Sequence, residues 1–189
     1  RRASFIGHSL YNKVVGVIGI GNTGGCVAET LKFGFRCRVL AYDPYKTKLE
    51  IEQHGAEKVE FEDLIRNSDV ICLCANLTEE NYHFISKKEI EMMKPNVYIS
   101  NSARGALVDE KAIVEGLKSG KIAGFATDVL EVEPGRANHP YLAFENVVVT
   151  PHTSAYTIKC VEDCEVIVEG KLPVRSVQSK SSYVKGEVK

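Results

Sequence analysis

The chain has 189 residues, which is enough for one α/β domain with a substantial core. Hydrophobic residues make up 44% and charged residues 26%, and a formal net charge of −1 excludes the strongly basic class of nucleic-acid and anionic-membrane binders. No apolar run approaches membrane-spanning length, and the first residues, Arg1 to Ser4, do not open a signal peptide. We therefore expect a cytoplasmic protein, and the missing initiator Met suggests part of a longer chain.

An apolar run at residues 14–18 ends in a turn with the spacing G-x-G-x-x-G, and residues 26–32 are predicted to be helical. Gly19 permits the sharp turn, Gly21 lets a diphosphate approach the backbone, and Gly24 lets the helix pack close to the strand. The helix N-terminus adds unpaired N–H donors. The pattern predicts a dinucleotide site, although a glycine turn without a ligand fits the spacing alone.

A second apolar run, residues 38–42, ends in Asp43, about twenty residues further on. A carboxylate at this place accepts hydrogen bonds from an adenosine ribose and repels a 2′-phosphate. Asp43 therefore favours NAD over NADP. Lys46 and Lys48 lie close enough to leave NADP open.

The rest of the chain alternates predicted helices and strands without an internal repeat. Such alternation, with right-handed crossovers, predicts an α/β fold with a doubly wound parallel sheet of Rossmann type and ligands at the C-terminal strand ends. We expect strands at residues 57–59, 69–74, 96–100, 122–127 and 146–150, helices at 46–54, 61–67 and 109–119, a short helix capped by Thr78, and two helical pieces before Pro95.

The six cysteines do not have the placing of a disulfide scaffold. Cys72 and Cys74 lie on one face of a predicted strand, whereas Cys160 and Cys164 are spaced to share one side of a helix. That second pair could be half of a metal site, but no partner has suitable spacing. We expect reduced, buried thiols and no metal.

Polar side chains follow three of the predicted strands: Arg104, then Asp128 with Glu133, then His152. Arg can hold a carboxylate with two parallel N–H donors, and His exchanges protons near neutral pH. A carboxylate bonded to the imidazole would fix its tautomer. This set suits oxidation of an alcohol beside a carboxylate. Each member alone has a plainer alternative: a surface ion pair, a solvated acid, or a packed histidine.

Residues 101–110, 127–134 and 149–152, together with the glycine turn, resemble the signatures of the D-isomer-specific 2-hydroxyacid dehydrogenases. The resemblance implies that Arg104 binds the substrate carboxylate and carbonyl oxygen, that His152 is the acid/base, and that Glu133 is its partner. It implies NAD as cofactor, bound by Gly19, Gly21, Asn22, Thr23, Gly24, Asp43, Ala75, Asn76, Ser102, Ala103, Arg104, Asp128 and His152.

The resemblance further implies a substrate domain that is missing from this chain, and a homodimer. We expect a hinge or linker-helix remnant at residues 1–11, the dinucleotide-binding domain at 12–170, and a tail at 171–189 that returns to the missing domain. Glu133 argues against the similar formate dehydrogenases. An NAD(H)-sensing interaction module of corepressor type, with vestigial catalysis, stays open as the alternative to a dehydrogenase of small 2-keto or 2-hydroxy acids.

Overall fold

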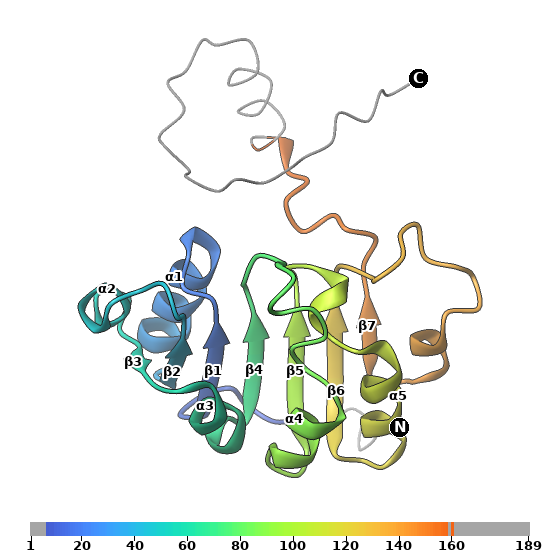
Figure 1. Ribbon diagram of the computed structural model, residues 1–189, viewed down its shortest axis with the longest axis horizontal. Helices are drawn as coiled ribbons and strands as arrows, with labels where there is room; N and C mark the ends of the chain where they lie inside the picture. The colour runs from blue at the N-terminus through green and yellow to red at the C-terminus, as the bar shows by residue number, and fades with distance from the viewer. Residues whose placement is uncertain (1–6, 159, 161–189) are drawn as a thin grey trace. The chain divides into compact units, whose positions relative to one another are not determined.

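The computed structural model describes residues 7–158 and 160, and its centre is a sheet of seven parallel strands (Figure 1). The strands are β1 (Val14–Ile18), β2 (Arg38–Tyr42), β3 (Glu57–Lys58), β4 (Val70–Leu73), β5 (Val97–Asn101), β6 (Ile122–Thr127) and β7 (Val147–Val149). Their order in space is β3-β2-β1-β4-β5-β6-β7, and every neighbouring pair is parallel. The doubly wound sheet expected from the sequence is confirmed.

Helices occupy most of the connections between strands. They are α1 (Asn22–Glu29), which continues as the π-helical turn η2 (Thr30–Gly34), then α2 (Lys48–Glu52), α3 (Phe61–Asn67), α4 (Lys87–Met92), the 3-10 turn η3 (Gly105–Leu107), α5 (Glu110–Lys118) and the 3-10 turn η4 (Pro140–Ala143).

Two separate apolar cores lie on the two faces of the sheet, because successive residues of a strand point to opposite faces. Val15 and Val17 of β1 are buried in a cluster with Ile51 of α2. Ile71 of β4 is buried in a second cluster with Leu64 of α3, to which α4 and α5 also contribute. Helices α1 and α2 therefore cover one face, and α3, α4 and α5 cover the other.

The direction of winding reverses between β1 and β4. From β1 the chain proceeds outward through β2 and β3, and then returns to the other side of β1 to add β4. In open parallel sheets, ligands bind beyond the C-terminal strand ends at such a switch point. The fold thus places the loops after β1 and β4 where a dinucleotide is expected.

Several helix predictions need correction. No helix begins at Thr78: residues 79–83 form a bend and turns, in which the Asn81 side chain accepts the Thr78 N–H at 2.7 Å and donates to the Asn76 carbonyl at 2.7 Å. Between β4 and Pro95 the chain forms one helix, α4, where two helical pieces were expected. The helix predicted at 46–54 is shorter, since Thr47 caps α2 and Glu50 completes a capping box. The predicted bounds of α3 and β6 are confirmed.

Residues 154–158 and 160 belong to a second compact unit, Ser154–Lys189. Within it, the Cys160 N–H donates to the Thr157 hydroxyl at 3.1 Å. Cys164 and the predicted tail at 171–189 lie outside the described residues. The boundaries after residues 11 and 170 stay predictions.

Candidate active site

The glycine turn after β1 has the conformation that the motif predicts. Gly19 has φ of +89°, and a Cβ there would lie 2.6 Å from the Ala75 Cα, so the loops after β1 and β4 are in close contact. A Cβ on Gly24 would collide with the Gly19 carbonyl oxygen. Gly21, by contrast, has no atom within 4 Å of a built Cβ. Gly19 and Gly24 are required by packing, whereas Gly21 borders open space that a ligand can enter.

Helix α1 begins directly after Gly21 and presents its N-terminus to that space. Asn22 and Thr23 are exposed, and the first turn contains no acidic residue that would compete with an anion. The first N–H groups of a helix are unpaired and carry partial positive charge. The residues present therefore fit the diphosphate of a dinucleotide.

Asp43 joins the end of β2 to the glycine turn. Its Oδ2 accepts the Ile20 N–H at 2.9 Å and its Oδ1 accepts the Tyr45 N–H at 2.9 Å. The carboxylate is half-buried beside the turn, and a carboxylate keeps further lone pairs for a ribose hydroxyl. The two nearby lysines are both paired, Lys46 with Glu50 at 3.0 Å and Lys48 with Glu52 at 3.6 Å. Their pairing weakens the case for a 2′-phosphate.

The loop after β5 is ordered by Asn101, which is 1% exposed. Its side chain donates to the Arg104 carbonyl at 2.9 Å and accepts the Ala103 N–H at 3.1 Å. Ser102 is exposed, and the Arg104 guanidinium donates to the Ala103 carbonyl at 2.6 Å. Arg104 thus lies at the predicted strand end, while its convergence on His152 remains a prediction.

Asp128 ties the ends of β5, β6 and β7 together. Its N–H donates to the Asn101 carbonyl at 3.0 Å, and its Oδ1 accepts the Thr150 hydroxyl at 2.6 Å and the Thr153 N–H at 2.9 Å. The residue is only 5% exposed. A buried carboxylate is costly unless it is hydrogen-bonded, so these donors explain how Asp128 is accommodated at the sheet edge.

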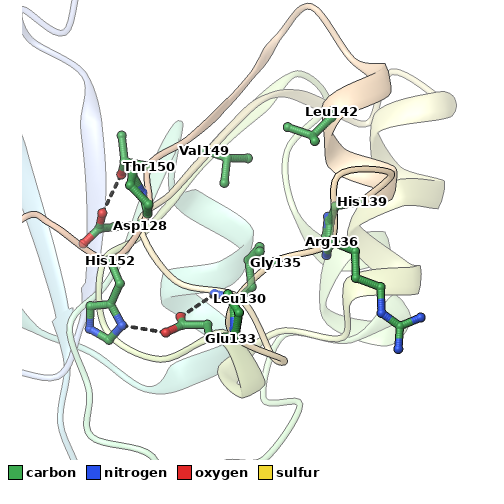
Figure 2. Close-up of a pocket in the computed structure, with 12 residues that line it drawn as sticks. Asp128, Leu130, Glu133, Gly135, Arg136, His139, Leu142, Val149, Thr150 and His152 are labelled. Carbon is green, nitrogen blue, oxygen red and sulfur yellow. Dashed lines mark hydrogen bonds and ion pairs between the residues drawn. The ribbon is translucent and has the colours of Figure 1, made fainter. Parts of the chain in front are cut away.

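Glu133 and His152 form the pair that the sequence predicts (Figure 2). His152 Nδ1 lies 2.8 Å from Glu133 Oε2, and Glu133 Oε1 accepts the Leu130 N–H at 2.9 Å. An ionised carboxylate only accepts hydrogen bonds, so Nδ1 carries the proton and Nε2 is left for proton exchange. His152 itself has φ of +55°, a left-handed conformation that is uncommon for histidine.

The pair borders a cavity of about 570 Å³. The Glu133–His152 pair and several apolar side chains line this cavity, as Figure 2 shows. The lining residues are Asp128, Leu130, Glu133, Pro134, Gly135, Arg136, His139, Leu142, Val149, Thr150, Pro151 and His152. A concave apolar surface with a few convergent polar groups is typical of a small-molecule site.

The thiols at the strand ends are structural. Cys72 and Cys74 pack on the same face of the sheet, as predicted. Burial raises the pKa of Cys72 to about 12 and that of Cys74 to about 11, so both stay protonated at neutral pH. Cys26 is exposed, which corrects the expectation that the thiols are all buried. In the part of the chain that the structure describes, no three His, Cys, Asp or Glu side chains gather in a metal-binding arrangement.

Asn101 and Thr150 were not singled out from the sequence, although both lie within the motif blocks. Asn101 shapes the Arg104 loop, and Thr150 holds Asp128. Asn101 is the last residue of β5, and Thr150 directly follows β7. These positions could have identified both residues from the sequence, since the strand ends of a parallel sheet meet at one edge.

Over residues 1–154 the chain matches the family described as D-isomer specific 2-hydroxyacid dehydrogenase, NAD binding domain. The chain belongs to this family. Among curated relatives of this 2-hydroxyacid dehydrogenase family, D-3-phosphoglycerate dehydrogenase of Archaeoglobus fulgidus is 41% identical over 183 residues, covering 93% of this chain and 34% of that protein. Glyoxylate reductase of Thermococcus litoralis is 37% identical over 184 residues, covering 97% and 53%.

Solved structures of 2-hydroxyacid dehydrogenases share the fold. Glyoxylate reductase from Paecilomyes thermophila superposes with a TM-score of 0.82 at 34% identity, covering 89% of this chain and 52% of that one. D-lactate dehydrogenase with NAD+ from Lactobacillus jensenii gives a TM-score of 0.73 at 29% identity, covering 88% and 56%. The family and this NAD-complexed neighbour support NAD as the cofactor.

The chain spans between about a third and about half of the length of these relatives. The relatives named are dehydrogenases and reductases, and nothing in them favours the corepressor-type alternative. Within the described residues, the helices are all too short or too polar to cross a membrane.

Proposed function

We propose that the chain is the coenzyme-binding part of an NAD-dependent dehydrogenase that interconverts D-2-hydroxy acids and 2-keto acids. The Glu133–His152 pair at 2.8 Å carries this proposal, since it supplies an oriented acid/base at the edge of the sheet where the glycine turn lies. Membership of the family and the dehydrogenase names of its relatives support it.

The cofactor would be held along the switch point. Gly19, Gly21 and Gly24 with Asn22 and Thr23 would hold the diphosphate, and Asp43 the adenosine ribose. The loops after β4, β5 and β6 would line the nicotinamide half through Ala75, Asn76, Ser102, Ala103 and Asp128. When bound, the nicotinamide supplies the hydride acceptor or donor of the reaction.

The chain's own residues would manage the substrate and its proton. Arg104 would clamp the carboxylate and polarise the adjacent oxygen with its guanidinium donors. His152 Nε2 would take the hydroxyl proton in oxidation and return it in reduction. Glu133 would hold the Nδ1 proton, which fixes the tautomer, and would stabilise the imidazolium that forms.

Three further proposals concern the domain boundaries, the oligomeric state and the location of the protein. We propose residues 12–170 as the dinucleotide-binding domain, flanked by a linker at 1–11 and a tail at 171–189. We propose a homodimer, which sedimentation equilibrium would test. We propose a cytoplasmic location, in keeping with the free thiols of Cys26, Cys37, Cys72, Cys74 and Cys160.

Assays of 2-keto acid reduction with NADH in the complete enzyme test the activity directly. A panel of pyruvate, glyoxylate, hydroxypyruvate, phosphohydroxypyruvate and branched-chain acids would identify the substrate. Turnover of none of them, together with retained NADH binding, would contradict the proposed activity.

A further inference from the structure

Glu131 contacts two segments besides its own loop, one through its carboxylate and the other through its backbone N–H. Its Oε1 accepts the Tyr82 hydroxyl at 2.6 Å, and its Oε2 lies 3.2 Å from His83 Nε2, both from the loop after β4. The backbone N–H of Glu131 donates to Glu110 Oε1 at 3.2 Å, at the start of α5. The hydrogen bond to Glu131 raises the pKa of the Tyr82 phenol.

The second carboxylate, Glu110, continues this network to the far end of the same loop. Its Oε2 lies 3.3 Å from His139 Nε2. His139 Nδ1 accepts the Tyr141 N–H at 3.3 Å, so Nε2 is the nitrogen that carries the proton toward Glu110. The loop that follows β6 is therefore held at residue 131 and again at residue 139, on either side of Glu133.

Backbone packing also holds the loops after β5 and β6 together. A Cβ on Gly105 would collide with the backbone of Leu130 and Glu131, so the loops after β5 and β6 touch directly. The His83 N–H also donates to the Ala106 carbonyl at 2.8 Å. The loops after β4, β5 and β6 thus lie against one another, and the Glu131 side chain bonds the loop after β6 to the loop after β4.

Glu131, Glu110 and His139 are better shielded from water than Glu133 and His152, the pair that they flank. The side chains of Glu131 and Glu110 are 27% and 26% exposed and that of His139 is 13% exposed, against 38% for Glu133 and 44% for His152. Exposed ion pairs gain little from their own attraction. The backbone that carries Glu133 also bears on the geometry of the pair, since the Leu130 N–H donates to Glu133 Oε1 at 2.9 Å.

We propose that Glu131, supported by Glu110, is a positioning residue that fixes the loop after β6 and thereby keeps Glu133 on Nδ1 of His152. The inference rests on the proposed function, in which the His152 tautomer matters for proton exchange. Displacement of the loop by about 1 Å would lengthen the 2.8 Å contact and release the tautomer.

Nitrogen-15 NMR of the histidine rings tests the proposal in the 189-residue chain, without any assay of activity. At a pH where the rings are neutral, His152 in the wild type should be predominantly the Nδ1–H tautomer. In Glu131→Ala, it should become a mixture of both tautomers. Glu131→Gln, which retains an acceptor for the Tyr82 hydroxyl, should restore most of the Nδ1–H form.

His54 provides a matched control in the same spectrum, because its Nδ1 lies 2.7 Å from Glu29 Oε1, far along the chain from the network. It should keep its tautomer in Glu131→Ala. Glu29→Gln should do the opposite, changing His54 and leaving His152 as it was. Should Glu131→Ala fail to fold, His83→Phe tests the same contact from the other loop and keeps an aromatic ring against Tyr82, where the rings now stack at 4.0 Å.

An unchanged His152 tautomer in Glu131→Ala and in His83→Phe would overturn the proposal, as would equal changes at His54 and His152, which would indicate general loss of structure. NADH binding is measured on the same samples. Failure of the wild-type chain to bind NADH would contradict the proposed function. The tautomer of His152 would still decide the role of Glu131.

Discussion

At the scale of single residues, the glycines of the turn after β1 serve different purposes. Gly24 is buried against the Gly19 carbonyl, so its missing side chain is needed by the fold. Gly21 meets nothing within 4 Å, and its φ of −88° is open to any residue. The motif predicts both positions, and the structure separates Gly24, which packing requires, from Gly21, which borders the space for a ligand.

Gly21→Ala should leave stability nearly intact, within about 1 kcal/mol, because it adds a methyl group to open space at a helix N-cap. It should weaken NADH binding at least tenfold, since the methyl group would stand between the backbone and the diphosphate. Gly24→Ala is the matched control and should lower the free energy of unfolding by about 1–3 kcal/mol. Urea unfolding and calorimetry measure both. Equal effects of the two variants on stability would contradict this division.

Glu133→Gln should lower kcat/KM for keto-acid reduction in the complete enzyme by about 10²-fold or more, because an oriented acid/base contributes on this order. His152→Asn should lower it by at least as much. NADH affinity should change little in Glu133→Gln, since the pair lies beyond the diphosphate site. Glu29→Gln removes the partner of His54 and is the matched control. Full activity of Glu133→Gln would show that the pair is structural.

At the scale of helices and strands, the sequence predicts the bounds of an element correctly where several local signals agree. Phe61–Asn67 and Ile122–Thr127 have the predicted bounds, since apolar periodicity and flanking turn residues agree there. Thr78 does not begin a helix, although Asn81 accepts its N–H as in a capping box; Asn81 also donates to the Asn76 carbonyl, and residues 79–83 form a bend and turns. The hydrogen bonds from Thr150 and Thr153 to Asp128 join strand ends that are far apart in the sequence, so no local pattern specifies them.

The start of β4 is fixed by Asp69, whose Oδ2 accepts the Val14 N–H at 3.0 Å and whose Oδ1 pairs with Lys94 at 2.9 Å. Burial alone would raise the pKa of Asp69, but the hydrogen bonds from Lys94 and Val14 and the charges of Lys94 and Lys13 hold it below its ordinary value. A lowered pKa means that the stabilisation is present above the unfolded value near pH 4 and is lost as the pH falls through the folded pKa.

Lys94→Met should therefore lower the free energy of unfolding by about 1 kcal/mol at neutral pH, a modest figure because both side chains are about one-third exposed. The difference from wild type should shrink below about pH 4, as Asp69 becomes protonated. Lys88→Met, at an exposed position of α4, is the control. Urea titrations at neutral and acidic pH measure both, and a difference that does not depend on pH would point to lost packing instead.

At the scale of the whole molecule, the chain corresponds to about half of the solved structures that it resembles. It covers 52% of the glyoxylate reductase from Paecilomyes thermophila and 56% of the D-lactate dehydrogenase from Lactobacillus jensenii. The Glu133–His152 pair is exposed to solvent in this chain, although dehydrogenation favours a site closed to water.

The isolated chain should accordingly bind NADH but reduce 2-keto acids slowly or not at all, because its Glu133–His152 pair is open to solvent. Stopped-flow measurement of NADH oxidation with an excess of keto acid checks this. Robust turnover by the isolated chain would contradict the expectation and would mean that Arg104, Glu133 and His152 suffice for substrate binding.

Calorimetric titration of the chain with NADH and, separately, NADPH tests the central claim most directly. The account predicts that NADH binds at one site and that NADPH binds at least tenfold more weakly, because the Asp43 carboxylate beside the glycine turn would repel a 2′-phosphate and both nearby lysines are paired. Absence of NADH binding, or tighter binding of NADPH, would contradict it.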